Sequence, residues 1–344
     1  MEAMKNYSLV IMGSKRVGKS SLRSALSHYR KDFSNMGPTE TVTFSADTFL
    51  NNHISMRDYG TTEEGMRLQL HRTTYKKVDG LIFVFNAVAE DRAGELEHFL
   101  KVWKMLASES PNAKVYIFYH RTDLIQGSRT EALCSFGMEL KGSMVEAQAR
   151  PHELKLMATS VFDRESVSGA WSTVFRSLCG SPEGWSQRLT TFGVGMGFDQ
   201  VLVFDKRHKM LVKNITLDET KRALNNFECQ TRVAGWWESR DRIDGLVIEG
   251  KRRIYIHEYA YNSILIGVTD NDTITPFSWR VAVKGSKTLE RKWDARNRKG
   301  HKMSPMDEKD KDRSRNNASQ SSSDSEPIIN IMVESLRINH LDLK

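Results

Sequence analysis

Two glycines, a lysine and a serine near the start of the chain have the spacing of a phosphate-binding loop. The stretch reads G-x-x-x-x-G-K-S from Gly13 to Ser20, between an apolar run over 7–12 and a helix-permissive run over 21–29. In this setting backbone N–H groups reach phosphate oxygens, and the helix N-terminus favours the same anion. Lys19 is placed for the β- and γ-phosphates and Ser20 for Mg²⁺. The expected phosphate contacts are Gly13, Ser14, Lys15, Arg16, Val17, Gly18, Lys19, Ser20 and Ser21.

An aspartate that follows a later apolar run predicts which base is bound. Asp123 stands just after the run over 114–119. Its carboxylate can accept two hydrogen bonds from the N1–H and amino groups of guanine, whereas adenine offers no matching pair of donors. The neighbouring Arg121 can stack over the base as a lysine would. After the next short strand, residues 159–161 offer backbone N–H groups to the guanine carbonyl. The expected guanine contacts are His120, Arg121, Asp123, Ser160 and Val161.

The elements around these motifs alternate between strand and helix. Apolar runs predict strands over 6–12, 42–44, 54–56, 80–85, 114–119 and 155–160, and helices over 21–29, 96–107, 131–140, 144–149 and 170–178. This alternation predicts an α/β domain over 6–182 with a doubly wound, mostly parallel sheet. Ligands of such folds bind at the carboxyl ends of the strands, where each of these motifs falls.

The pattern changes after a turn-rich break at 180–184. A hairpin over 200–204 and 210–214, a long amphipathic helix over 218–238, strands over 244–249, 253–259 and 263–269, and a helix over 279–293 are expected. They predict an α+β domain over 189–294 with an antiparallel sheet and no recognisable catalytic constellation. Residues 295–327 are charged and serine-rich, as in disordered segments. The apolar tail over 328–344 fits either a short docking helix or a frayed end.

Composition limits the classes of function. A chain of 344 residues with 39% hydrophobic residues suggests about two domains with substantial cores. The net charge of +8 is scattered, and with no nucleic-acid motif we expect no nucleic-acid partner. The three cysteines are far apart, as in reduced cytosolic thiols. There is no apolar run of about 18 residues, secretory signal or lipidation signal, so membrane residence is expected through partners and not by direct insertion.

These motifs together resemble the Rag-type small GTPases of the Ras-like superfamily, in particular the Rag A/B class. The resemblance rests on G-x-x-x-x-G-K-S-S-L-R-S from 13 to 24, on H-R-T-D-L from 120 to 124 and on T-S-V-F-D from 159 to 163. It makes Met36-Gly-Pro-Thr39 the first switch, with Thr39 closing on Mg²⁺ and the γ-phosphate. It also makes the second half a roadblock domain through which such proteins dimerise.

The second switch departs from the family pattern Asp-x-x-Gly-Gln. The resemblance assigns Asp58 to Mg²⁺, beside Ser20 and Thr39, and adds Thr39, Gly60 and Thr61 to the phosphate contacts. Thr61 stands where the family has glycine, and Thr62 replaces the glutamine that orients the attacking water. A threonine lacks the paired donor and acceptor of an amide. Thr62 and Thr39 are therefore the candidate catalytic residues of an enzyme expected to bind GTP and GDP but to hydrolyse GTP slowly.

The resemblance also implies partners. Rag proteins form heterodimers of an A/B-type with a C/D-type subunit, sit on lysosomes or vacuoles through a scaffold complex, and signal amino-acid sufficiency to the TOR kinase complex. Three alternatives stay open: a scaffold that binds GTP without hydrolysing it, a Ras-like GTPase of membrane trafficking, and a P-loop kinase for adenine nucleotides. Thr61 and Thr62 favour the non-hydrolysing scaffold, whereas Asp123 disfavours the adenine-nucleotide kinase.

Overall fold

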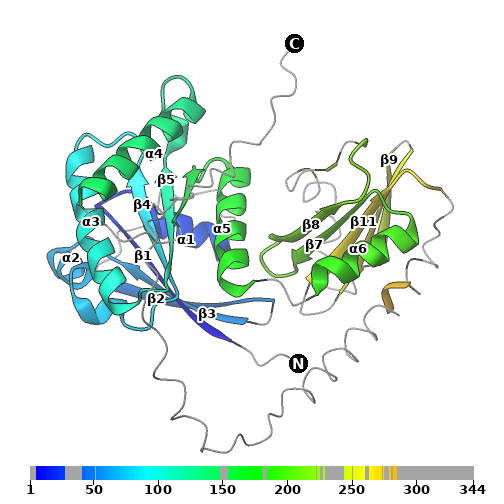
Figure 1. Cartoon of the computed structure of the whole chain (residues 1–344), viewed down its shortest axis with the longest axis horizontal. Helices are drawn as coiled ribbons and strands as arrows, with labels where there is room; N and C mark the ends of the chain where they lie inside the picture. The colour runs from blue at the N-terminus through cyan, green and yellow to red at the C-terminus, as the bar shows by residue number, and fades with distance from the viewer. Residues whose placement is uncertain are drawn as a thin grey trace, which may run out of the picture.

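The structure is a computed structural model, and it describes two sheets with their helices (Figure 1). The described residues are 5–27, 41–50, 52–147, 154–180, 184–221, 244–249, 251–259 and 263–272, with single residues or short pieces between 223 and 284. Thr39 and the rest of the expected first switch, and the segments over 295–327 and 328–344, lie outside them. Within the described part of the chain, no helix has the length and apolar character needed to cross a membrane.

The first sheet has six strands and is mostly parallel. They are β1 (Asn6–Gly13), β2 (Val42–Phe49), β3 (Asn52–Tyr59), β4 (Gly80–Asn86), β5 (Lys114–His120) and β6 (Leu154–Thr159), in the order β2-β3-β1-β4-β5-β6. Only β2 runs antiparallel to its neighbour, and its hairpin with β3 makes both strands longer than the runs over 42–44 and 54–56 predicted. The mixed α/β class with a parallel-dominated sheet is therefore confirmed.

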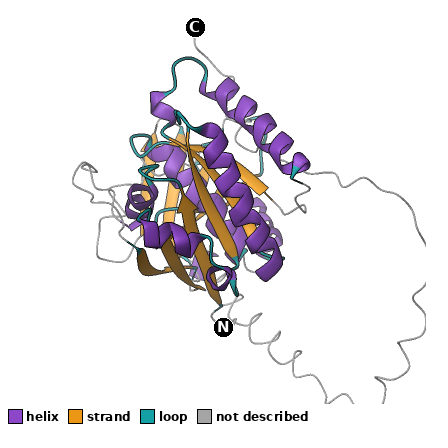
Figure 2. Ribbon diagram, turned by 90° about the vertical axis from the view of Figure 1, so that its left-hand side faces the viewer, coloured by secondary structure: helices purple, strands orange, loops and turns teal. Residues whose placement is uncertain are grey.

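Helices cover both faces of this sheet (Figure 2). One face of β1, β4 and β5 is covered by α1 (Lys19–Ser27) and α5 (Arg164–Cys179). The other face is covered by α3 (Arg92–Glu109) and α4 (Arg129–Glu146). A short helix that the sequence analysis did not predict, α2 (Glu63–Gln69), follows β3, and the 3₁₀ turns η1 (Arg72–Tyr75) and η2 (Thr122–Leu124) lie between the larger elements. The prediction of separate helices over 131–140 and 144–149 is wrong: α4 is one helix, because Leu140 and Met144 are buried one turn apart on the same face.

The second sheet is antiparallel, as predicted. It contains β7 (Gln200–Asp205), β8 (Leu211–Thr216), β9 (Asp244–Glu249), β10 (Arg252–Glu258) and β11 (Ser263–Thr269), in the order β8-β7-β11-β10-β9. An unpredicted helix, α6 (Trp185–Met196), precedes it. The long helix expected over 218–238 does not begin at Asp218, whose carboxylate accepts the Thr220 N–H at 3.0 Å and forms a turn there; most of the remaining residues lie outside the described part. The roadblock identity and the domain bounds stay predictions.

One hydrophobic cluster runs through both halves of the described chain. It joins side chains of β1, β4, α1 and α5 to Trp185 of α6, Val203 of β7 and Val212 of β8. Phe49, at the end of β2, contacts Phe175 of α5 with ring centroids 5.2 Å apart. The second sheet therefore packs on the α5 side of the first domain as part of a common core.

A buried group of charges lies at the junction of the two domains. His208, just after β7, donates through Nδ1 to Asp205 at 2.9 Å, and its Nε2 lies 2.8 Å from the Asp47 carboxylate of β2. The side chains of these three residues are almost fully buried. Although burial lowers it, the two carboxylates raise the His208 pKa to about 9. We call this trio the His208 clamp.

Candidate functional site

Both glycines of the phosphate-binding loop are required by the geometry. Gly13 has φ +141°, and a Cβ there would lie 2.4 Å from the Val84 carbonyl oxygen of the neighbouring strand. Gly18 has φ +94°, and a Cβ there would lie 2.7 Å from the imidazole of His120. Left-handed backbone and close packing therefore coincide at both positions. The loop follows β1 and leads into α1, which begins at Lys19, as a phosphate cradle requires.

Lys19 lies folded over its own loop. Its ammonium group donates to the carbonyl oxygens of Gly13 and Ser14, each at 3.0 Å, and the side chain is buried. Burial lowers its pKa to about 8, opposed by the negative charges of Asp58 and Glu95. The position fits a cation that binds phosphate oxygens across the loop, since the added anionic charge would favour the protonated amine.

Two side chains with oxygen atoms that could bind a cation meet at the start of α1. The Ser20 hydroxyl donates to Asp58 Oδ2 at 3.0 Å, and Asp58, at the end of β3, is fully buried. The Arg23 Nε, one turn further along α1, lies 3.3 Å from the same oxygen. Among the described residues no group of three or more His, Cys, Asp or Glu could hold a metal by itself. A hydroxyl beside one carboxylate fits Mg²⁺, which takes few protein ligands and completes its shell with water and phosphate.

His120 lies in a different place from that expected of a base contact. It is buried at the end of β5, where Nδ1 pairs with Thr159 Oγ1 at 3.0 Å and the ring packs on Gly18. Burial is the main cause that lowers its pKa to about 4, so the imidazole is neutral. The side chain therefore joins β5, β6 and the phosphate loop, and the other expected guanine contacts, Arg121 and Asp123, follow it in the chain.

Arg121 ties the guanine loop to the phosphate loop. Its backbone is left-handed (φ +65°), and its guanidinium donates to the carbonyl of Arg16. Asp123 follows in η2 and is partly exposed, as a side chain that meets a ligand would be. The N–H of Ser160 donates to Ser166 Oγ at 3.1 Å, so it can reach a guanine carbonyl only by giving up that bond. Val161 lies next to it, partly buried.

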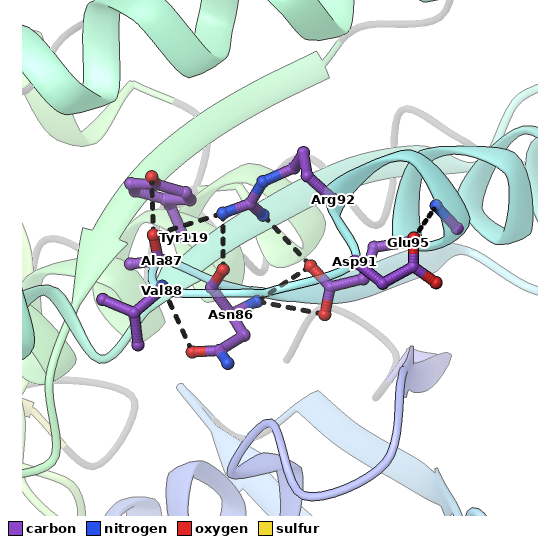
Figure 3. A network of polar contacts seen from close by, with 8 residues as sticks. Asn86, Ala87, Val88, Asp91, Arg92, Glu95 and Tyr119 are labelled. Atoms are coloured by element: carbon purple, nitrogen blue, oxygen red, sulfur yellow. Dashed lines mark hydrogen bonds and ion pairs between the residues drawn. The ribbon is translucent and has the colours of Figure 1, made fainter.

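A polar network braces the ends of β4 and β5 behind the loops (Figure 3). Arg92 of α3 donates to the carbonyls of Asn86 and Ala87 at 2.6 and 3.2 Å and pairs with Glu95 at 3.0 Å. Its guanidinium also lies 5.3 Å from the ring centre of Tyr119. The Glu95 carboxylate accepts the Asn86 N–H, and burial raises its pKa to about 7. The ends of both strands are therefore held by one arginine.

The second switch uses Thr62 as the cap of a helix. The Thr62 hydroxyl accepts the Gly65 N–H at 3.2 Å at the N-terminus of α2. Gly60, two residues earlier, donates its N–H to the Thr41 carbonyl at 2.7 Å, and Thr61 between them is partly exposed. Of the two candidate catalytic residues, Thr62 lies at the start of α2, four residues after Asp58, and Thr39 is outside the described part.

Three residues of the site escaped the sequence analysis: Arg23, Gln69 and Arg92. Arg23 lies four residues after Lys19 on the same helix, a spacing that could have directed attention to it. Arg92 and Glu95 have the spacing of an ion pair on one helix face. Gln69 is fully buried and bonded to the Gly60 carbonyl. No sequence pattern indicates Gln69, because its partners are backbone groups brought near by the fold.

Comparison with known proteins agrees with this geometry. The model of the Gtr1/RagA G protein conserved region matches residues 8–233. The GTP-binding protein GTR1 of Saccharomyces cerevisiae is 28% identical over 212 residues, which cover 60% of this chain and 68% of that protein. The GTP-binding protein gtr1 of Schizosaccharomyces pombe is 25% identical over the same length, covering 60% and 67%. The Ras-related GTP-binding protein B of Rattus norvegicus is 23% identical over 183 residues, covering 53% and 44%.

The family match includes the phosphate loop, Asp58, the guanine loop and the start of the second sheet. Members of this family are G proteins that bind GTP and GDP and hydrolyse GTP. The loops that the structure assembles at the carboxyl ends of β1, β3 and β5 provide what such a nucleotide requires. The chain is a GTPase that belongs to the Gtr1/RagA family of G proteins.

Proposed function

We propose that the chain is a guanine-nucleotide switch of the A/B type that hydrolyses GTP slowly by itself. The observation that carries the proposal is the position of Thr62. Its hydroxyl caps α2 through the Gly65 N–H, and a threonine has no carboxamide with which to orient a water molecule. The elements for nucleotide affinity are in place, so binding is strong while turnover is limited.

We also propose Mg²⁺ as the cofactor. Ser20 and Asp58 would hold the ion through their side-chain oxygens. When bound, the metal would neutralise phosphate charge. The chain itself orients the phosphates through Lys19 and the loop N–H groups, and Thr39 is the expected ligand that joins when GTP is bound.

The biological setting is proposed from the family. The second domain would pair with a C/D-type subunit, and the heterodimer would be held on a lysosome or vacuole by a scaffold complex and report amino-acid sufficiency to the TOR kinase complex. The antiparallel second sheet supports the proposed pairing with a second subunit, since a sheet of this kind can present an edge strand to a related sheet. Membrane residence would come entirely through these partners.

Single-turnover hydrolysis of GTP by the purified full chain tests the proposed chemistry. We expect a rate below about 10⁻⁴ s⁻¹, slower than the intrinsic rate of Ras, which keeps the glutamine. Thr62→Gln should raise the rate, whereas Thr62→Ala, which loses the cap equally, should not. A wild-type rate equal to that of glutamine-containing relatives would contradict the proposal. If no GTP were hydrolysed at all, the result would favour the alternative of a scaffold that binds the nucleotide without turnover.

Affinity purification tests the proposed partnership. We expect the full chain to recover a C/D-type GTPase subunit in equal amounts. Recovery of unrelated proteins alone would contradict the assignment of the second domain.

A further inference from the structure

The phosphate loop carries two exposed cations in addition to Lys19. Lys15 and Arg16 stand between the two glycines of the loop, and both residues are exposed. Neither forms an ion pair with another residue of the described chain. Lys19, in contrast, is buried and lies in the field of the Asp58 and Glu95 carboxylates. Two positive charges without compensation from the described residues therefore border a loop whose backbone N–H groups face phosphate.

One end of the loop marks the position of the terminal phosphates. The Lys19 ammonium, which binds the β- and γ-phosphates in loops of this type, donates to the carbonyls of Gly13 and Ser14 at 3.0 Å. The second switch reaches the same end, because Gln69 donates to the Gly60 carbonyl at 2.9 Å and its Oε1 faces the Gly13 N–H at 3.5 Å. The residue that follows Ser14 therefore lies beside the end of the nucleotide that distinguishes GTP from GDP.

The other end of the loop lies toward the base. The Arg121 guanidinium donates to the Arg16 carbonyl, and Asp123, the expected guanine contact, follows Arg121 by two residues. The backbone of Arg16 is left-handed (φ +59°), so the chain bends sharply at this residue. Lys15 and Arg16 are neighbours in the sequence, but Lys15 follows the terminal-phosphate end of the loop and Arg16 belongs to the base end.

We propose that the Lys15 ammonium binds the γ-phosphate of GTP and makes the site prefer GTP to GDP. The flexible four-carbon stem of a lysine lets its ammonium reach an anion beside its own loop segment. GDP has no phosphate at that end, so the ion pair raises the affinity for GTP alone. Arg16, at the base end, attracts both nucleotides alike.

This contact would be a property of this chain and not of the loop type. The pattern G-x-x-x-x-G-K-S leaves the four residues 14–17 unspecified, and a lysine at position 15 is one choice among many. The inference deepens the proposed function, since it rests on GTP as the ligand, but it does not depend on the rate of hydrolysis.

Affinities of the full chain for fluorescent GDP and GTPγS, measured with Mg²⁺, test the proposal. In Lys15→Gln we expect GTPγS to bind about 5- to 10-fold more weakly and GDP to change less than about twofold, as for one partly solvated ion pair with phosphate. Lys15→Arg keeps the charge and should keep the ratio of the two affinities.

Arg16→Gln offers a matched control. It removes the same charge from the next residue, which is also exposed, so a general electrostatic effect would act in both variants. We expect it to weaken GDP and GTPγS by the same factor. An equal loss of both nucleotides in Lys15→Gln, or the same change of their ratio in Arg16→Gln, would overturn the proposal and leave Lys15 a solvated surface cation.

Two further observations keep the outcomes distinct. Salt screens a solvated ion pair, so the wild-type preference for GTPγS should fall between about 50 and about 300 mM salt; a preference independent of salt would overturn the proposal without any variant. Urea unfolding without nucleotide should be the same for Lys15→Gln and the wild type, because the position is exposed. A wild-type chain that binds neither nucleotide would refute the proposed switch itself.

Discussion

Removing the charge of His208 should destabilise the protein below neutral pH and leave it nearly unchanged above pH 9. The imidazolium lies between the carboxylates of Asp47 and Asp205 and beside the ring of Phe175. Asp205 also accepts the Leu50 N–H at 3.2 Å, so the clamp fixes the end of β2 to β7. His208→Gln keeps a polar side chain of similar size and removes the charge.

The magnitude follows from the raised pKa. A rise of the His208 pKa from 6.5 to about 9 corresponds to about 3 kcal/mol of stabilisation. Because the folded pKa lies above the unfolded value, this stabilisation is fully present below about pH 6.5 and is lost as the pH rises through 9. The side chain is 2% exposed, so solvent screening reduces the value little.

Urea unfolding followed by tryptophan fluorescence measures the effect, with saturating GDP at each pH between 6 and 10. The wild type should exceed His208→Gln by about 3 kcal/mol at pH 6, and the difference should shrink steadily toward pH 10. Other groups that titrate in this range, such as Lys19, are common to both proteins and cancel in the difference. A difference that stays constant from pH 6 to pH 10 would refute the charged clamp.

Three further predictions concern the nucleotide site. Gly18→Ala should weaken fluorescent-GDP binding at least about 100-fold, because φ is +94° and the new methyl group meets the His120 imidazole. The control Gly142→Ala, whose methyl group enters open space, should not weaken binding. Equal GDP affinities of the two variants would contradict this requirement for Gly18. Arg23→Gln removes a cation that competes with Mg²⁺ for Asp58. The Mg²⁺ concentration at which nucleotide release is half-maximally slowed should therefore fall about tenfold. An unchanged concentration would argue against this competition. Arg92→Met should lower the free energy of unfolding in urea by about 2–3 kcal/mol, because hydrogen bonds and ring contacts are lost. A decrease below about 0.5 kcal/mol would contradict this role of Arg92.

The sequence predicted the parts of the fold in which local pattern and tertiary packing agree. The apolar runs of β4 and β5 are buried on both faces, so their assignment needed no knowledge of the partners. Within α4, Gly142 and Ser143 locally favour a break, yet burial of Leu140 and Met144 carries the helix through. Helix α6 was missed because its buried residues are few and its sequence contains two threonines and two glycines, which favour helices weakly.

The site shows a similar division. The phosphate loop could be predicted from spacing because its chemistry comes from consecutive backbone groups. The inward position of His120 depends on Gly18 and Thr159, which are far from it in the sequence. The buried position of Gln69 depends on its bond to the carbonyl of Gly60, and backbone carbonyls carry no residue identity that a pattern could reveal. Residue roles set by distant backbone therefore required the structure.

The common core of the two domains has a consequence for the fate of the protein in a cell. Bound nucleotide stabilises the folded chain by an amount that grows with the logarithm of the nucleotide concentration relative to its Kd. Because Phe175 of α5 and Val203 of β7 belong to the same buried cluster, that stabilisation extends to the second sheet. A chain that has lost its nucleotide would then expose its second domain to proteases as readily as its first. Loss of the nucleotide would thus make the whole chain, and not the first domain alone, a substrate for degradation.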